Sequence, residues 1–153
     1  MSKNAGNEAE AEAYAEAKNL ATRNVAEIAL HIAALPKKTD RPRLVVFTQG
    51  TLPTIVAYEG KTSSYPIIKV DPSNLVDTNG AGDGFCGGFL SQVWFDHVNC
   101  LPLVIVLISS PYQIQFVQGK PIEQCVAGGL YLASIVVQRS GPTYPKEPST
   151  FTF

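Results

Sequence analysis

Residues 76–89 read VDTNGAGDGFCGGF and place Asp83 directly after Gly-Ala-Gly, at the predicted start of a helix. The helix dipole favours a carboxylate in the first turn, so a capped turn explains the pattern. Glycine on both sides of Ala81 also lets the backbone approach a ligand closely. Successive N–H groups at a helix start can hold a phosphate or a charge that develops during a reaction. The stretch therefore predicts either a tight turn with a capping Asp or an anion site with an acidic group beside it.

An acidic group beside an anion site suits one class of reaction. From the first turn of the helix, Asp83 could accept a proton from an attacking hydroxyl, and a positioned general base contributes about 10²- to 10⁴-fold in rate. This combination suits phosphoryl transfer to an alcohol. The stretch contains no lysine and differs from the GxxxxGK(S/T) loop and from the protein-kinase glycine loop. Phosphate binding here would depend on backbone donors and a metal ion.

Composition and charge exclude several classes of protein. The 153 residues are 45% hydrophobic and 16% charged, which suits one folded domain and not a disordered tail. The net charge of -1 and the lack of a basic, aromatic stripe argue against a nucleic-acid or membrane-surface partner. No signal-peptide core precedes the first helix, and the cysteines have no metal-like spacing. We expect a protein of a reducing compartment, the cytoplasm, with the nucleus as a further location.

Apolar periodicity and turn residues predict an order of elements. Four helices are expected, at residues 7–18, 25–35, 81–92 and 121–139. Asn7 is the expected N-cap of the first, and Gly141 follows the last. Three strands are expected, at residues 44–48, 54–58 and 65–70. Glu59 and Gly60 join the last two strands in a hairpin, and the whole order predicts an α/β fold.

Residues 93–115 differ in character from the rest of the chain. Their apolar run is shorter than the roughly 20 residues of a membrane helix, and Pro102 interrupts it. A membrane segment and a buried extra strand are two interpretations. A third is a retained in-frame intron, because deleting the segment leaves a short, ordinary helix–helix connection. Its first residue, Val93, has codons that begin GT, and its last, Gln115, can be written CAG, as intron ends require.

The longer string DTNGAGDGFCGGF, residues 77–89, resembles the second signature of the ribokinase-like (PfkB) carbohydrate and nucleoside kinases, DTxGAGDxFxGGF. Within this family the chain is most similar to the adenosine kinase branch. Four further stretches carry that similarity: GNEAEAEAYA at 6–15, LVVFTQG at 44–50, FLSQ at 89–92 and SIVVQRSGPTYPKEP at 134–148. The resemblance implies a partial kinase domain over 1–153, the C-terminal portion of a three-layer α/β/α fold. The N-terminal half, with the lid and most nucleoside contacts, would lie outside it.

The resemblance also implies roles for the residues of the glycine-rich loop. Asp83 would be the catalytic base that deprotonates the 5′-hydroxyl of adenosine. Gly80, Ala81 and Gly82 would form the anion hole for the transferred γ-phosphoryl group. Thr78 would orient the loop or approach ATP, with a turn-forming threonine as the alternative.

Two further motifs would lie beside ATP. Asn7 and Glu10 match the family's NxxE motif, in which the glutamate helps to hold Mg²⁺ through water; the alternative is an N-cap followed by a solvated glutamate. Thr48 and Gly50 match the T-x-G that ends a strand near the ATP phosphates, and Gln49 between them is interpreted as structural.

Two residues of the predicted helix at 81–92 have interpretations of their own. We interpret Cys86 as a packing residue in preference to a reactive thiol. Gly84 stands where the family commonly has alanine, at a modest cost in helix propensity.

The implied activity is phosphorylation of adenosine to AMP, with ATP and Mg²⁺ as cofactors and a monomeric full-length enzyme. One rival is another PfkB kinase that acts on a sugar or a different nucleoside. Asn79 and the FTQG strand end favour the adenosine branch. The other rival is a truncated isoform without catalytic activity.

Overall fold

The computed structural model describes residues 5–38, 40, 42–92 and 121–141. These residues fall into two compact units, one that ends at Ile67 and one that begins at Ile68. Residues 93–115, with their intron, strand and membrane interpretations, lie outside the described residues. Within the described part of the chain, no helix is long and apolar enough to cross a membrane.

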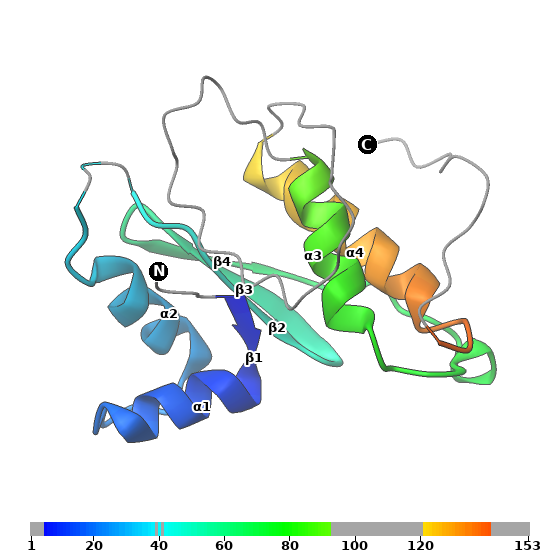
Figure 1. Cartoon of the computed structure of the whole chain (residues 1–153), viewed down its shortest axis with the longest axis horizontal. Helices are drawn as coiled ribbons and strands as arrows, with labels where there is room; N and C mark the ends of the chain where they lie inside the picture. The colour runs from blue at the N-terminus through cyan, green and yellow to red at the C-terminus, as the bar shows by residue number, and fades with distance from the viewer. Residues whose placement is uncertain (1–4, 39, 41, 93–120, 142–153) are drawn as a thin grey trace. The chain divides into compact units, whose positions relative to one another are not determined.

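The first unit is a four-stranded sheet with two helices (Figure 1). Its strands, in spatial order, are β1 (Ala5–Asn7), β2 (Val45–Gln49), β3 (Leu52–Tyr58) and β4 (Lys61–Tyr65). β1 runs parallel to β2, and the other two pairs are antiparallel. The helices are α1 (Glu8–Ala17) and α2 (Val25–Ala34), which confirm two of the predicted helices within one or two residues.

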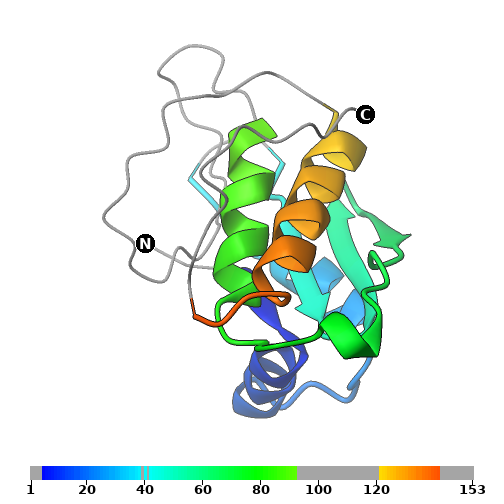
Figure 2. The same ribbon diagram turned by 90° about the vertical axis from the view of Figure 1, so that its right-hand side faces the viewer.

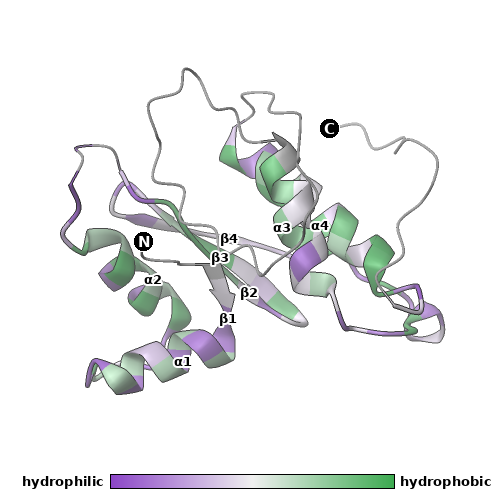
Figure 3. Cartoon of the chain, viewed as in Figure 1, coloured by the Kyte–Doolittle hydropathy of each residue, from purple (hydrophilic) through white to green (hydrophobic). Residues whose placement is uncertain are grey.

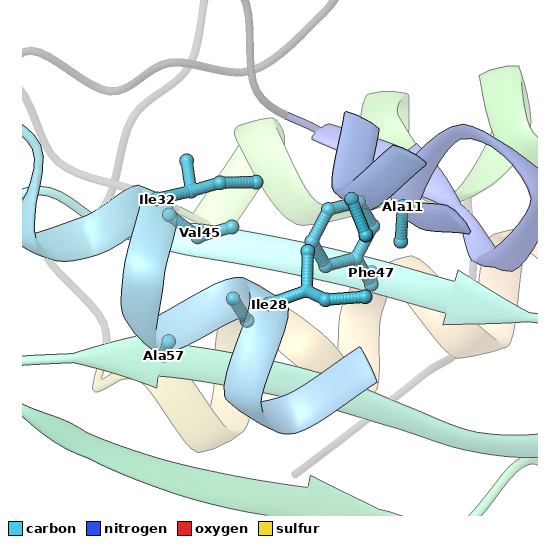
Figure 4. Packing of buried hydrophobic residues seen from close by; sticks show 8 residues of the cluster. Ala11, Ile28, Ile32, Val45, Phe47 and Ala57 are labelled. Atoms are coloured by element: carbon cyan, nitrogen blue, oxygen red, sulfur yellow. The ribbon is translucent and has the colours of Figure 1, made fainter. Parts of the chain in front are cut away.

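The core of this unit lies between the two helices and one face of the sheet (Figure 4). In the hydropathy colouring, α2 is largely apolar, whereas α1 alternates apolar and charged residues (Figure 3). Alternate residues of β2 point to the same face, so Val45 and Phe47 both reach the helices. The buried members of the core are Ala11, Ala15, Ile28, Ala29, Ile32, Val45, Phe47 and Ala57.

A buried arginine ends α2. The guanidinium of Arg43 donates hydrogen bonds to the carbonyl oxygens of Ile32, Leu35 and Pro36, and only 7% of the residue is exposed. These carbonyls belong to the last turn of α2 and to the two residues after the helix, where the helix dipole favours a positive charge. Arg43 therefore fixes the connection that leads from α2 into β2.

The hairpin corrects one predicted strand. Glu59 and Gly60 form the predicted turn, and both have positive φ, 49° and 74°, as in a tight two-residue turn of the I′ type. Lys61 therefore pairs with Tyr58 at once, and β4 covers Lys61–Tyr65 instead of residues 65–70. The prediction was wrong because β4 is a polar edge strand, which has no apolar alternation to reveal it.

The second unit holds η1 (Pro72–Asn74), a single 3₁₀ turn, and two long helices, α3 (Ala81–Gln92) and α4 (Ile122–Val136). α3 and α4 lie side by side in both views (Figures 1 and 2). An added Cβ on Gly88 would meet the carbonyl oxygen of Gly128, and one on Gly129 would lie 2.8 Å from the ring of Phe85. Glycine at these positions therefore allows the two backbones to approach closely.

Both of these helices were predicted, with one difference at an end. α4 stops at Val136 and not at Arg139, because Gln138 and Arg139 donate to carbonyls three residues back, which tightens the last turn. Gly141 follows with φ 72°, in agreement with its predicted position beyond the helix.

Candidate active site

The first cluster of predicted site residues lies at the ends of β1 and β2. Asn7 is both the last residue of β1 and the N-cap of α1, and it pairs in register with Thr48 of β2. Parallel pairing thus brings the NxxE motif and the T-x-G motif to the same edge of the sheet. The sequence did not reveal this neighbourhood, because β1 is only three residues long and was not predicted.

Asn7 and Glu10 form a reciprocal capping box. The side-chain oxygen of Asn7 accepts the N–H of Glu10 at 3.0 Å, and the carboxylate of Glu10 accepts the N–H of Asn7 at 3.0 Å. The N-cap prediction is therefore confirmed. Glu10 remains exposed, so its carboxylate can still reach solvent and a hydrated ion. The roles of both residues beside ATP stay predictions.

The T-x-G motif ends β2 in a tight turn. Gly50 has φ 56° between Gln49 and Leu52, a conformation that favours glycine. The β2–β3 register shifts between Phe47 and Gln49, and the side-chain amide of Gln49 donates to the carbonyl of Pro53 at 2.6 Å. Gln49 is therefore structural, as expected, and pins the turn.

Glu8 lies beside this turn and was not predicted as a site residue. One of its carboxylate oxygens would lie 3.8 Å from a Cβ on Gly50, and it belongs to the first turn of α1. A signal was present, since the NxxE motif of residues 7–10 carries a second acidic residue directly after its asparagine. Together Glu8 and Glu10 make this edge of the sheet acidic.

The residues of this edge fit a hydrated Mg²⁺ and not a protein-enclosed ion. Among the described residues, no group of three or more His, Cys, Asp or Glu side chains is arranged to hold a metal. Mg²⁺ commonly keeps several waters and is bound by one or two carboxylates together with substrate phosphates. The exposed carboxylate of Glu10 suits such an outer contact.

The second cluster is the loop that opens α3. Asp77 accepts the N–H of Asn79 at 2.9 Å, and Thr78 accepts the N–H of Ala81 at 3.2 Å. Gly80 follows with φ 80°, and its carbonyl oxygen accepts the N–H of Gly84 at 2.8 Å as the helix begins. These bonds close a compact turn that delivers the chain directly into α3.

Two backbone donors of this turn are available to a ligand. Within the described part of the chain, no acceptor engages the N–H of Gly82 or of Asp83, as is usual for the first helical residues. No atom lies within 4 Å of a Cβ added to Gly82, so the space beside it is open. The free donors and the positive end of the helix dipole suit an anion.

Asp83 completes this cluster. It is exposed in the first turn of α3, one residue after Gly82, so its carboxylate is open to a substrate hydroxyl. Thr78 is also exposed, and its carbonyl takes part in the turn, which supports its turn-forming role. Its predicted approach to ATP stays a prediction. The predicted loop residues thus lie together in the second unit, and the residues of the NxxE and T-x-G motifs lie together in the first.

Cys86 lies on α3 one turn after Asp83. Burial, with a smaller contribution from the Asp83 charge, raises the pKa of the Cys86 thiol to about 11. A thiol of this kind stays protonated near neutral pH and is a poor nucleophile. This supports the interpretation of Cys86 as a packing residue.

Both the sequence relatives and the structural relatives of this chain include adenosine kinases. The chain is 41% identical over 144 residues to adenosine kinase 2 of Arabidopsis thaliana, which covers 94% of this chain and 35% of that protein. The adenosine kinase of Anopheles gambiae, solved in complex with P1,P4-di(adenosine-5) tetraphosphate, matches with a TM-score of 0.71 and 34% identity, over 95% of this chain and 37% of that one. The Schistosoma mansoni enzyme, solved with adenosine and AMP, matches with a TM-score of 0.68 and 28% identity, over 93% and 35%.

The chain thus spans about a third of the length of these relatives, and the α/β fold that it shares with them confirms the predicted ribokinase-like class. The match to the pfkB family carbohydrate kinases covers residues 4–149, almost the whole chain, including the capping box, the T-x-G turn and the Asp83 loop. The chain therefore belongs to the pfkB carbohydrate kinase family.

Proposed function

We propose that this chain carries the phosphoryl-transfer machinery of an adenosine kinase, which forms AMP from adenosine and ATP. The observation that carries the proposal is the exposed carboxylate of Asp83 beside the unengaged N–H groups of Gly82 and Asp83 at the start of α3. The relatives supply the substrate class, because they are adenosine kinases and one was solved with adenosine and AMP.

The groups of the loop would have separate roles in phosphoryl transfer. Mg²⁺–ATP, when bound, supplies the γ-phosphoryl group and neutralises part of its charge. Of the predicted anion hole, Gly80, Ala81 and Gly82, the N–H of Ala81 is bonded to the Thr78 carbonyl, so the N–H groups of Gly82 and Asp83 would donate to the phosphoryl oxygens. Gly80 and Ala81 would form the turn that holds those donors in place. The Asp83 carboxylate would take the proton of the 5′-hydroxyl as that oxygen forms a bond to the γ-phosphorus. The bond from the γ-phosphorus to the bridging oxygen would break, and ADP would leave with its electron pair.

The residues at the ends of β1 and β2 would bind ATP. Asn7 and Gly50 would lie beside the phosphates, with Thr48 at the strand end. Glu10 would hold water around the metal ion. Their support is the parallel register of β1 and β2, which places Asn7 opposite Thr48. Gly50 adds to it, because it is exposed and has no Cβ to keep a ligand from its backbone.

The experiment is a phosphorylation assay on the purified full chain with Mg²⁺–ATP and a panel of acceptors: adenosine, cytidine and ribose. Product is identified by mass spectrometry, and ATP binding is measured in parallel by calorimetry. The proposal predicts AMP from adenosine, with a kcat/KM well above that for the other acceptors. Preference for ribose or cytidine would establish the rival sugar or nucleoside kinase. ATP binding without any product would establish the rival chain without catalytic activity.

A further inference from the structure

The last turn of α4 is bonded to the beginning of the glycine-rich loop. The carbonyl oxygen of Val137 accepts the N–H of Val76 at 2.9 Å and the N–H of Asp77 at 3.2 Å. Val137 is the C-cap residue of α4, where carbonyl groups have no partner within the helix. The N–H groups at the beginning of the loop thus satisfy a carbonyl oxygen at the end of α4 that has no partner within the helix. These hydrogen bonds hold the first residues of the loop against that end of α4.

The same turn of α4 also packs against the far end of the loop. Val136 is fully buried, with 0% of the residue exposed. Its Cγ1 would lie 3.7 Å from a Cβ on Gly80, and its Cγ2 would lie 2.9 Å from a Cβ on Gly84. The Val136 side chain therefore lies against both the turn that forms the proposed anion hole and the first turn of α3.

We propose that Val136 is a positioning residue for phosphoryl transfer, which keeps the Gly80 turn and the start of α3 in the geometry of the anion hole. The inference rests on the proposed function of that loop. A β-branched side chain in a helix has one strongly preferred χ1 rotamer, so Val136 presents a stiff surface. The Val137 hydrogen bonds fix one end of the loop, and the Val136 methyl groups fix the other.

Gly84, which has no side chain, lies at the contact between Val136 and α3. Non-bonded carbon atoms are optimally about 3.5–4.0 Å apart. A Cβ at Gly84 would lie only 2.9 Å from Val136 Cγ2, so glycine here lets Val136 come closer to α3 than the alanine common in the family would. Removing the Val136 methyl groups would leave that space empty below the loop.

The test compares Val136→Ala with Val126→Ala in the full chain. Val126 is also 0% exposed and lies on the same helix, about 15 Å away along its axis at 1.5 Å per residue, so the two truncations are matched. Hydrogen exchange is followed at the N–H groups of Val76 and Gly84, together with the melting temperature and kcat.

We expect both variants to lower the melting temperature, and only Val136→Ala to speed exchange at Val76 and Gly84. Because small misplacements of reacting groups can cost about 10²-fold, kcat should fall by up to that factor with KM for ATP little changed. Adding Gly84→Ala to Val136→Ala should restore part of the lost packing. Exchange at Val76 and Gly84 should then slow again, and kcat should partly recover. If Val136→Ala does not fold, Val136→Thr keeps the branched shape and should retain slow loop exchange.

Equal exchange and equal kcat in the two alanine variants would overturn the inference and make Val136 an ordinary core residue. Faster loop exchange with unchanged kcat would also overturn it, since the loop geometry would then not matter to the reaction. A wild-type chain without turnover, but with the expected exchange difference, would instead overturn the proposed function and leave the structural support of the loop by Val136 established.

Discussion

At the scale of single residues, the fold does not need a glycine at position 82, whereas the proposed binding of an anion does. Nothing lies within 4 Å of a Cβ added at this position, so a larger residue meets no obstacle within the protein. Its N–H is one of the two donors proposed for the phosphoryl oxygens. The fold therefore does not require glycine here, whereas close approach of an anion does.

Replacement of Gly82 by alanine should leave the chain folded and keep the backbone N–H, but the added Cβ would occupy the open space beside that donor. A bound anion would be displaced, so turnover should fall by up to about 10²-fold, the loss that a small misplacement of reacting groups can cause. Higher helix propensity should raise the free energy of unfolding by up to about 1 kcal/mol. Denaturant unfolding and AMP formation measure the two effects. Gly87→Ala is the matched control, because its Cβ would lie 3.7 Å from Leu132 in ordinary contact, and it should leave turnover unchanged. Full activity in Gly82→Ala would show that the reaction does not need close approach of an anion to this position.

Cys86 provides a test of the environment at the start of α3. Burial raises the pKa of its thiol to about 11, so the reactive thiolate is scarce at pH 8 and its share grows as the pH rises toward that value. Alkylation of Cys86, read by peptide mass spectrometry, should therefore be slow at pH 8 and accelerate up to about pH 11. Asp83→Asn removes the smaller, electrostatic contribution and should speed alkylation modestly. Rapid alkylation of the native chain at pH 7 would show that the half-buried position of Cys86 does not raise the pKa of its thiol.

At the scale of elements, the approach of α3 to α4 depends on glycine at the crossing. A Cβ on Gly88 would meet the backbone of Gly128 and Gly129, which cannot move aside as a flexible side chain can. The rings of Phe85 and Phe89, with centroids 5.9 Å apart, complete the buried face of α3. This contact packs the middle of α3 closely against α4.

Gly88→Ala should therefore destabilise the chain by at least the roughly 1–3 kcal/mol that overpacking costs, in spite of the better helix propensity of alanine. Denaturant unfolding measures the change, with Gly87→Ala, the adjacent position on the same helix, as the control that should not destabilise. Equal stability of the two variants would mean that the helices lie farther apart than the structure shows.

The N-terminus of α1 combines a structural and a proposed chemical role, and its capping box allows the two to be separated. Asn7→Ala should lower the free energy of unfolding by about 1 kcal/mol, as should Asn24→Ala at the N-cap of α2, where the side chain accepts the N–H groups of Ala26 and Glu27. Only Asn7→Ala should also weaken ATP binding, measured by calorimetry. Asn7→Ser keeps a capping oxygen and should restore stability. Identical ATP affinity in the two alanine variants would leave Asn7 with a capping role alone.

At the scale of the whole molecule, the sequence predicts helices better than it predicts which distant segments lie next to one another. The four helices were predicted because the signals for a helix are local in sequence: an N-cap such as Asn7, apolar periodicity, and a glycine such as Gly141 after the end. β1 and β4 were missed or misplaced because a three-residue strand and a polar edge strand depend on their partners. The meeting of Asn7 with Thr48 follows from that pairing, so no local pattern could have shown it.

The same distinction holds for the candidate site. The Asp83 loop is one continuous string, and its turn at Gly80 and its exposed carboxylate agree with the glycine pattern. The support from Val136 and Val137 comes from a helix more than fifty positions along the chain and has no signature in the loop itself.

The most direct measurement is the turnover of adenosine and Mg²⁺–ATP to AMP by the full chain, its Asp83→Asn variant and its Asp71→Asn variant. Asp71 is an exposed residue of the same unit whose role is to cap η1, so its variant removes an equal charge away from the loop. We predict turnover by the wild type and by Asp71→Asn, and a loss of about 10²- to 10⁴-fold in Asp83→Asn with ATP affinity unchanged. Equal turnover in all three chains, or none from a folded wild type that binds ATP, would contradict the assignment of Asp83 as the base.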